Sequence, residues 1–344
     1  MVRMARVWGL ALLLVPLAGC ASSGDPASAT PGASFVPPFD MTLDGDAAPR
    51  GRVHVEDGTV VTDRGTLLRG VYWSIDWDGQ LPDRQALADI RDLGLNAIHV
   101  FGESDDGLPA GAYMEQIDTM VRWCGELGLY CVLTIGIGRE YNEAKAWFGE
   151  DFWTVYAPRY KDVPWVLYEV YNEPEWGEAP YRDDTMQMEQ DLYDLIRGYA
   201  PDTHILLLTY TGLVDADGVQ EDVERLDVDW SNASVAWHGY GVDLEAEKEC
   251  LLGMRAAGIV SMTTELPVGQ CCEEGWVDED PPWWSDPYVN VDKIRFAEEN
   301  HTSWLTHITL EYIHDDWRFR DRIDDAGICW VPDYGTWPSA SCAV

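Results

Sequence analysis

The stretch Pro164-Trp165-Val166-Leu167-Tyr168-Glu169-Val170-Tyr171-Asn172-Glu173-Pro174 carries the strongest signal in this sequence. Residues 165–171 form a mainly apolar run with the length and composition of a buried strand. Asn172-Glu173-Pro174 then places a carboxylate at the carboxyl end of that strand, before a proline that turns the chain. A carboxylate in this place suits general acid/base chemistry. The tripeptide is short, so its meaning depends on its surroundings.

Short apolar runs alternate with helical patterns along the rest of the chain, which is typical of a parallel sheet wrapped by helices. Between the runs, residues such as Leu87, Ile90 and Leu93 recur at helical spacing. Eight such units in about 250 residues predict a closed (β/α)8 TIM barrel. The segment Val53 to Asp63, with a turn at Asp57-Gly58, predicts a short N-terminal β-hairpin. The predicted strands are Leu67 to Ile75, Ala97 to Gly102, Tyr130 to Ile135, Trp165 to Tyr171, His204 to Thr209, Ser234 to Tyr240, Ile259 to Thr264 and His307 to Ile313.

The first residues read as a targeting signal. Arg3 and Arg6 precede an apolar stretch that is too short to span a bilayer and that ends in Leu17-Ala18-Gly19-Cys20. This resembles a bacterial lipoprotein signal, which implies cleavage before Cys20 and a lipid on its thiol. An ordinary secretory signal with a chance cysteine is the alternative. The predicted organisation is a signal peptide over 1–19, a flexible Ala/Ser/Gly/Pro-rich tether over 20–50 and one catalytic domain over 51–344.

Charge restricts the partners of this protein. The formal net charge is −38, and only four residues are lysine. Such a chain repels nucleic acid and other polyanions, so a nucleic-acid partner is not expected. A cationic polymer such as chitosan remains compatible with this charge. We expect a monomer, attached to a membrane only through Cys20.

The cysteines predict disulfides rather than a metal site. Seven remain without Cys20, and an exported protein can form disulfides. Their spacings match no zinc pattern, so we expect no structural metal. The local pairs that the spacing suggests, which leave one thiol over, are Cys124 with Cys131, Cys250 with Cys271 or Cys272, and Cys329 with Cys342.

Four polar residues fall at the carboxyl ends of predicted barrel strands, where the chemistry of such barrels takes place. Glu173 ends the fourth strand and Glu265 ends the seventh. His238 and Tyr240 end the sixth strand, and the two-residue period of a strand points them the same way. The sequence therefore predicts two carboxylates, an imidazole and a phenol around one mouth.

With these residues in place, the chain resembles the catalytic domain of glycoside hydrolase family 5 over roughly residues 53 to 317. The approach to the fourth strand, including Phe152-Trp153 and Tyr160, is part of the resemblance. It implies Glu173 as acid/base, Glu265 as nucleophile and Asn172 as a donor to the sugar 2-hydroxyl. It implies supporting roles for His238 and Tyr240, and no cofactor.

The sequence also departs from the family pattern. His99 stands where the family usually has an arginine on strand two that braces the nucleophile. Gly136 follows strand three where a histidine is usual, and the usual strand-eight tryptophan falls near Leu310 or Glu311. These departures motivate one alternative, a surface glycan-binding lipoprotein that has lost turnover. We place His99 among the residues of the substrate site.

Aromatic residues after the strand ends are candidates for stacking on sugar rings. By contrast, Trp123, Trp147, Trp153 and Trp165 are expected to pack in the core, and Glu103 is expected to be a solvated loop acid. The candidate platforms for a sugar are Trp73, Trp77, Trp176, Trp284 and Trp317.

The sequence as a whole predicts an extracytoplasmic, lipid-anchored TIM barrel that cleaves β-linked polysaccharides with retention. The expected activity is that of an endo-β-glucanase or a mannanase, with xylan as a further possible substrate. A chitosanase or a transglycosylase in the same barrel is the enzymatic alternative. A retaining enzyme needs its two carboxyl groups about 5 to 5.5 Å apart.

Overall fold

The computed structural model describes residues 39–41, 43, 51–74, 81–103, 108–135, 146–175, 179–239, 244–266, 291–307, 323 and 327–328. Chain contacts separate Met1–Phe35 from a compact unit, Val36–Val344, that contains all of these residues. The predicted signal peptide, Cys20 and most of the tether therefore lie outside the described residues. Within the described residues, no helix combines the length and apolar character needed to cross a membrane.

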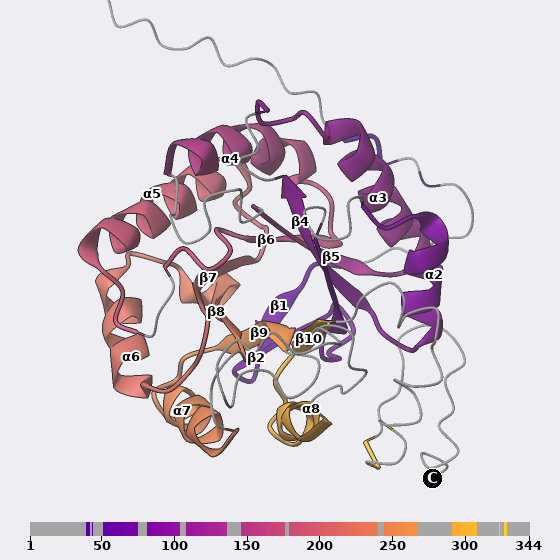
Figure 1. Ribbon diagram of the computed structural model, residues 1–344. Helices are drawn as coiled ribbons and strands as arrows, with labels where there is room; N and C mark the ends of the chain where they lie inside the picture. The colour runs from indigo at the N-terminus through magenta and orange to yellow at the C-terminus, as the bar shows by residue number, and fades with distance from the viewer. Residues whose placement is uncertain are drawn as a thin grey trace, which may run out of the picture. The chain divides into compact units, whose positions relative to one another are not determined.

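Eight parallel strands close into a barrel, in the order β10-β3-β4-β5-β6-β7-β8-β9 (Figure 1). This confirms the predicted TIM barrel. The strands are buried along nearly their whole described length, because helices cover the outside and side chains fill the inside. They are β3 (Arg69–Ser74), β4 (Ala97–Glu103), β5 (Tyr130–Ile135), β6 (Val166–Glu169), β7 (Ile205–Tyr210), β8 (Ala233–His238), β9 (Ser261–Leu266) and β10 (Trp304–His307).

A ring of helices surrounds the barrel (Figure 1). In α2, Ala86, Leu87 and Ile90 form the buried stripe predicted by their spacing, and Asp83 caps the helix by accepting a hydrogen bond of 2.9 Å from the backbone N–H of Ala86. The helices are α2 (Arg84–Asp92), α3 (Met114–Leu127), α4 (Ala146–Tyr160), α5 (Asp183–Tyr199), α6 (Ala216–Arg225), α7 (Leu244–Ala256) and α8 (Val291–Glu299), with the short 3-10 helix η1 (Trp230–Asn232) before β8.

The predicted hairpin is present before the barrel. Strands β1 (His54–Glu56) and β2 (Thr59–Val61) pair antiparallel. The two residues of the turn, Asp57 and Gly58, have φ angles of 50° and 76°. A turn with two positive φ angles matches the twist of a hairpin, and Asp-Gly adopts it readily.

The eighth strand begins three residues before the predicted run. It runs over Trp304–His307, before most of the predicted run from His307 to Ile313. Trp304 and Leu305 are fully buried, and they pair with Arg69 and Gly70 of β3. Residues 308–313 lie outside the described residues. The predicted start was three residues late, because an apolar run does not mark the residue at which pairing with β3 begins.

The predicted disulfides of Cys124 and Cys250 are wrong. Cys124, Cys131 and Cys250 are buried free thiols. Contact with the Cys124 thiol, reinforced by burial, raises the pKa of Cys131, so these two neighbouring side chains act as small apolar core residues. Cys329 and Cys342 lie outside the described residues.

Candidate active site

Glu173 lies just beyond the carboxyl end of β6, in a backbone conformation that is rare for glutamate. Its φ angle is 45°, and only 7% of the residue is exposed. A non-glycine residue held in the left-handed region costs on the order of 1–3 kcal/mol, and such strain is often found at functional sites. The preceding Asn172 is 2% exposed, and its Oδ1 has no hydrogen-bond partner in the described part of the chain. Within the described residues, Asn172 Oδ1 is therefore left for an external ligand.

Glu265 and His238 meet Glu173 at this mouth. Glu265 lies in β9 and is 5% exposed, and His238 ends β8 and is fully buried. One carboxylate or imidazole atom from each of the three residues lies within 4.8 Å of the other two. Carboxylate oxygens this close are compatible with a retaining pair, whose carboxyl groups lie about 5 to 5.5 Å apart.

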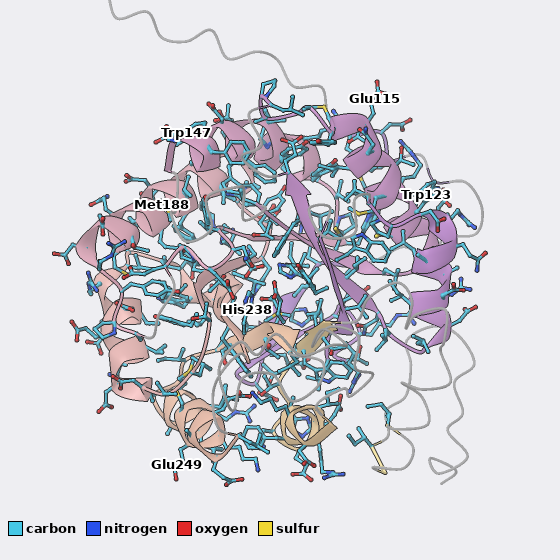
Figure 2. The ribbon with its side chains drawn as sticks, viewed as in Figure 1. Glu115, Trp123, Trp147, Met188, His238 and Glu249 are labelled. Carbon is cyan, nitrogen blue, oxygen red and sulfur yellow. The ribbon has the colours of Figure 1, made fainter. Side chains whose placement is uncertain are left out.

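His238 connects the two carboxylates, and Figure 2 labels it inside the ring of helices. Its Nδ1 lies 2.6 Å from Glu173 Oε1, and its Nε2 lies 3.1 Å from Thr264 Oγ1 and 3.6 Å from Glu265 Oε1. Burial disfavours the charged imidazolium, but the carboxylates of Glu265 and Glu173 outweigh it and raise the pKa of His238 to about 9. At neutral pH the ring is therefore protonated, and it donates from Nδ1 to Glu173.

A second buried pair lies beneath the nucleophile candidate. His99 Nε2 forms an ion pair with Glu169 Oε2, and His99 Nδ1 lies 3.9 Å from Glu265 Oε1. Glu169 Oε1 accepts hydrogen bonds from Thr209 Oγ1 at 2.6 Å and from Thr264 Oγ1 at 3.2 Å. Burial works against the charge on Glu169, but His99 overcomes it and lowers the pKa of that carboxyl. The interior of the barrel therefore contains an ionised acid that holds His99 in place below Glu265.

Glu173, His238 and Glu265 form a set that could ligate a metal ion. Ligation requires a neutral imidazole, however, and the raised pKa of His238 keeps its ring protonated. Both ring nitrogens also already face protein oxygens. The donor set is better suited to holding and moving protons than to binding a cation.

The comparison with known families agrees with this geometry. Residues 59–267, more than half of the chain, match the family model described as cellulase (glycosyl hydrolase family 5). The chain belongs to glycosyl hydrolase family 5. Members of this family are retaining glycoside hydrolases, and this protein is therefore one as well.

Solved structures share the fold of this family 5 hydrolase at low sequence identity. A β-glucanase from Saccharophagus degradans has a TM-score of 0.60 at 18% identity, over 80% of this chain and 89% of that chain. The catalytic domain of an endoglucanase from Thermobifida fusca has a TM-score of 0.57 at 19% identity, over 76% and 85%. The catalytic domain of a mannanase from Streptomyces sp. SirexAA-E has a TM-score of 0.56 at 18% identity, over 76% and 82%.

Two predicted substrate contacts fall on side chains that are buried in the described structure, and their contact with a sugar stays a prediction. His99 is fully buried beside Glu265, where it braces the site from within the barrel. Its ring packs against Tyr72 inside the barrel. The two-residue period of β3 then directs Trp73 toward the helices, and it is only 1% exposed in the hydrophobic core.

The structure describes some of the other residues that were singled out in the sequence, and two of these differ from expectation. Glu103 is buried and accepts hydrogen bonds from the N–H groups of Gly111 and Tyr113, so it is not a solvated acid. Trp147 is 57% exposed near the start of α4, toward the periphery in Figure 2, and is not a core residue. Of the remaining site candidates, those outside the described residues are Tyr240, Trp77, Trp176, Trp284 and Trp317.

The polar residues that support the site from below do not stand out in the sequence. Glu169, Thr209 and Thr264 lie within buried strands and looked like ordinary strand residues. A signal was present in Glu169, which lies four residues before Glu173 in an otherwise apolar run. A charged residue in a buried strand requires a partner, and that requirement points to His99.

The variant His99→Gln tests the role of this brace in the family 5 hydrolase. Glutamine keeps a donor for Glu169 but removes the ring nitrogen that lies 3.9 Å from Glu265 Oε1. We expect kcat to fall about tenfold, which corresponds to about 1.4 kcal/mol of transition-state stabilisation, with KM nearly unchanged. Steady-state kinetics on a soluble glycan measures both constants. The control is His204→Gln, because His204 is equally buried but bonds to Ser234 at the start of its strand. An equal loss of kcat in both variants would show only a general packing effect.

Proposed function

We propose that this protein hydrolyses internal β-glycosidic bonds of a glucan, with Glu173 as acid/base and Glu265 as nucleophile. The observation that carries the proposal is the approach of Glu173, His238 and Glu265 to within 4.8 Å at the carboxyl ends of β6, β8 and β9. The description of the matched family as cellulase favours glucan. Mannan is the second candidate, because a structural neighbour is a mannanase.

In the first step, Glu265 attacks the anomeric carbon while Glu173 gives its proton to the leaving oxygen. The C–O bond to the leaving group breaks and a glycosyl ester to Glu265 forms. In the second step, Glu173 accepts a proton from water, and the water oxygen attacks the anomeric carbon and releases Glu265. Two inversions leave the β configuration unchanged.

His238 is close enough to Glu173 to exchange a proton with it. Its Nδ1 lies 2.6 Å from Glu173 Oε1, close enough for direct transfer. The protonated ring holds a proton beside Glu173 at the start of the cycle. Transfer of that proton to Glu173 as Glu265 becomes a neutral ester supplies the proton that the leaving oxygen receives in the first step, and the proton that Glu173 accepts from water in the second step can return to the ring.

The substrate is tested by offering the purified protein soluble β-glucan, galactomannan, xylan and chitosan. We expect reducing ends to appear fastest on β-glucan, together with an early fall in viscosity that marks internal cleavage. Proton NMR of the first product should show the β anomer. Faster release from galactomannan or chitosan would reassign the substrate. Binding to these polymers without turnover would favour the glycan-binding alternative.

We also propose that the protein is attached to a membrane through a lipid on Cys20. This proposal rests on Leu17-Ala18-Gly19-Cys20 and the preceding apolar stretch. A lipid on Cys20 followed by a tether of about thirty residues would hold the barrel beside a membrane while leaving it free to reach a polymer.

A further inference from the structure

Lys293 is a buried lysine in a chain that has few lysines. Only four of the 344 residues are lysine. Lys293 lies in the first turn of α8 and is 4% exposed. Lysine is almost never fully buried unless it is paired, because its charge must leave water. Its location therefore calls for a physical reason.

Among the residues that the structure describes, two buried groups accept hydrogen bonds from the ammonium of Lys293. Its Nζ donates a hydrogen bond of 2.7 Å to the backbone carbonyl of Gly239 and pairs with Glu247 Oε2. Glu247 lies in α7 and is 1% exposed. Burial raises the pKa of Glu247, although Lys293 opposes this effect. Lys293 thereby links two outer helices to one backbone carbonyl.

Gly239 connects this ion pair to the catalytic residues. It directly follows His238 at the end of β8, and its N–H donates a hydrogen bond of 2.9 Å to the backbone carbonyl of Glu265. The same short peptide segment therefore touches the histidine that orients Glu173, the backbone of the nucleophile and the ammonium of Lys293. A displacement of Gly239 would move both catalytic groups.

Stability alone is a weak explanation for this arrangement. Replacing a buried ion pair by apolar side chains is often neutral or stabilising, because desolvation offsets much of the attraction. The need to fix the positions of His238 and Glu265 is a stronger explanation for the buried pair. A displacement of a catalytic group by about 1 Å can lower the reaction rate about a hundredfold. We propose that Lys293, held by Glu247, is a positioning residue that fixes the Gly239 carbonyl and with it the geometry of His238 and Glu265. This inference rests on the proposed roles of Glu173 and Glu265.

The test removes both charges together. Lys293→Met with Glu247→Leu removes both members of the described ion pair together, so we expect thermal unfolding close to that of the wild type. We expect kcat on soluble β-glucan to fall between about tenfold and a hundredfold, with KM changed much less. The alkaline limb of the pH–rate profile, which reports loss of the His238 proton near pH 9, should move to lower pH as contact with Glu173 and Glu265 loosens.

Two further variants separate positioning from stability. Lys248→Met removes a lysine on α7 that pairs with Glu245 at the surface, and it should leave kcat and the pH profile unchanged. Lys293→Gln with Glu247→Gln keeps polar groups in the site but has a side chain one bond shorter at position 293, which cannot reach the Gly239 carbonyl. It should show the same loss of kcat, and it provides the test if the apolar double variant does not fold.

The outcomes distinguish this inference from the proposed function. A double variant that folds like the wild type and keeps its kcat and pH profile would overturn the positioning role of Lys293. Absence of turnover in the wild type on every polymer would instead overturn the proposed function. Both double variants could instead lose thermal stability and kcat together while the pH profile stays unchanged. That result would mean that the pair of Lys293 and Glu247 serves folding, and it would also reject the positioning role.

Discussion

Glu265→Ala is expected to lower kcat by about ten-thousandfold or more on soluble β-glucan, because no covalent intermediate can form without the nucleophile. Glu173→Ala should lower it by between about a hundredfold and ten-thousandfold, the usual contribution of a general acid/base. The loss in Glu173→Ala should be smaller on an aryl glycoside whose leaving group needs no proton. The rates of reducing-end and phenol release measure these differences.

Azide distinguishes the two roles directly. In Glu265→Ala, azide fills the space of the carboxylate, attacks the anomeric carbon and gives the inverted α-glycosyl azide, with Glu173 still protonating the leaving group. In Glu173→Ala, Glu265 forms the ester first, and azide then gives the retained β-glycosyl azide. Proton NMR of the azide product identifies the anomer. Exchange of the two product configurations would reverse the assignment of the two glutamates.

The matched control is Glu175→Ala. Glu175 lies two residues beyond Glu173, but its carboxylate contacts Arg182 and Thr185. We expect turnover within about twofold of the wild type, as for a pair at a partly exposed position. A loss in Glu175→Ala comparable to that in Glu173→Ala would mean that the local chain conformation, and not the acid at 173, determines the rate.

Much of the fold followed from local patterns. Apolar runs such as Tyr130–Ile135 coincide with the observed strand, because a strand of a parallel barrel is buried on both faces and so has no polar alternation. Helices such as α3 show their buried stripe in the sequence, and Gly128 ends that helix in the left-handed conformation. Glu173 and Glu265 followed from the same count of strands, because the carboxyl ends of barrel strands share one face.

The supporting polar network did not follow from such patterns. His99 and Glu169 lie seventy positions apart, and only closure of the barrel brings them together. The sequence predicts Trp73 as a substrate contact because it is an aromatic residue near a strand end, and His99 because it stands where the family usually has an arginine. Neither pattern shows the direction of the side chain. Register with the neighbouring strand determines that direction, as the pairing of Tyr72 with His99 does here.

The network extends outward to a second buried acid, Glu189 of α5. Glu189 is fully buried, and its Oε2 accepts a hydrogen bond of 3.2 Å from the N–H of Leu208. Leu208 has a φ angle of 56° within β7, where the pairing with β8 shifts register before Tyr210. The next residue, Thr209, donates to Glu169. Glu189 therefore supports the irregular strand segment from which Thr209 reaches the interior of the barrel.

Glu189 should make the stability of the protein depend on pH. Burial, assisted by the charges of Glu169 and Asp222, raises its pKa from 4.5 to about 8, although the Leu208 N–H opposes this. Because the folded-state pKa is raised, the neutral acid stabilises the fold fully below the unfolded-state pKa. That stability is lost as pH rises toward the folded-state pKa. The interval from 4.5 to about 8 corresponds to about 5 kcal/mol at roughly 1.4 kcal/mol per pKa unit.

Glu189→Gln should remove this dependence. Glutamine has nearly the same shape, still accepts from the Leu208 N–H and carries no charge at any pH. Between pH 4.5 and 8, the free energy of unfolding of the wild type should therefore fall by about 5 kcal/mol relative to that of the variant. Urea unfolding of both proteins at closely spaced pH values measures the difference. The control is Asp194→Asn on the exposed face of the same helix, which should leave the pH slope of the wild type in place.

A constant difference between Glu189→Gln and the wild type across this interval would mean that Glu189 titrates alike in the folded and unfolded chains. Its charge would then have to be tolerated inside the protein beside Glu169 and Asp222. Burial makes that costly, because a carboxylate with one hydrogen bond from Leu208 lacks the partners that water supplies. The slope between pH 4.5 and 8 thus reports whether the strained segment of β7 is supported by a neutral acid, and only a steeper fall in the wild type than in Glu189→Gln agrees with the structure.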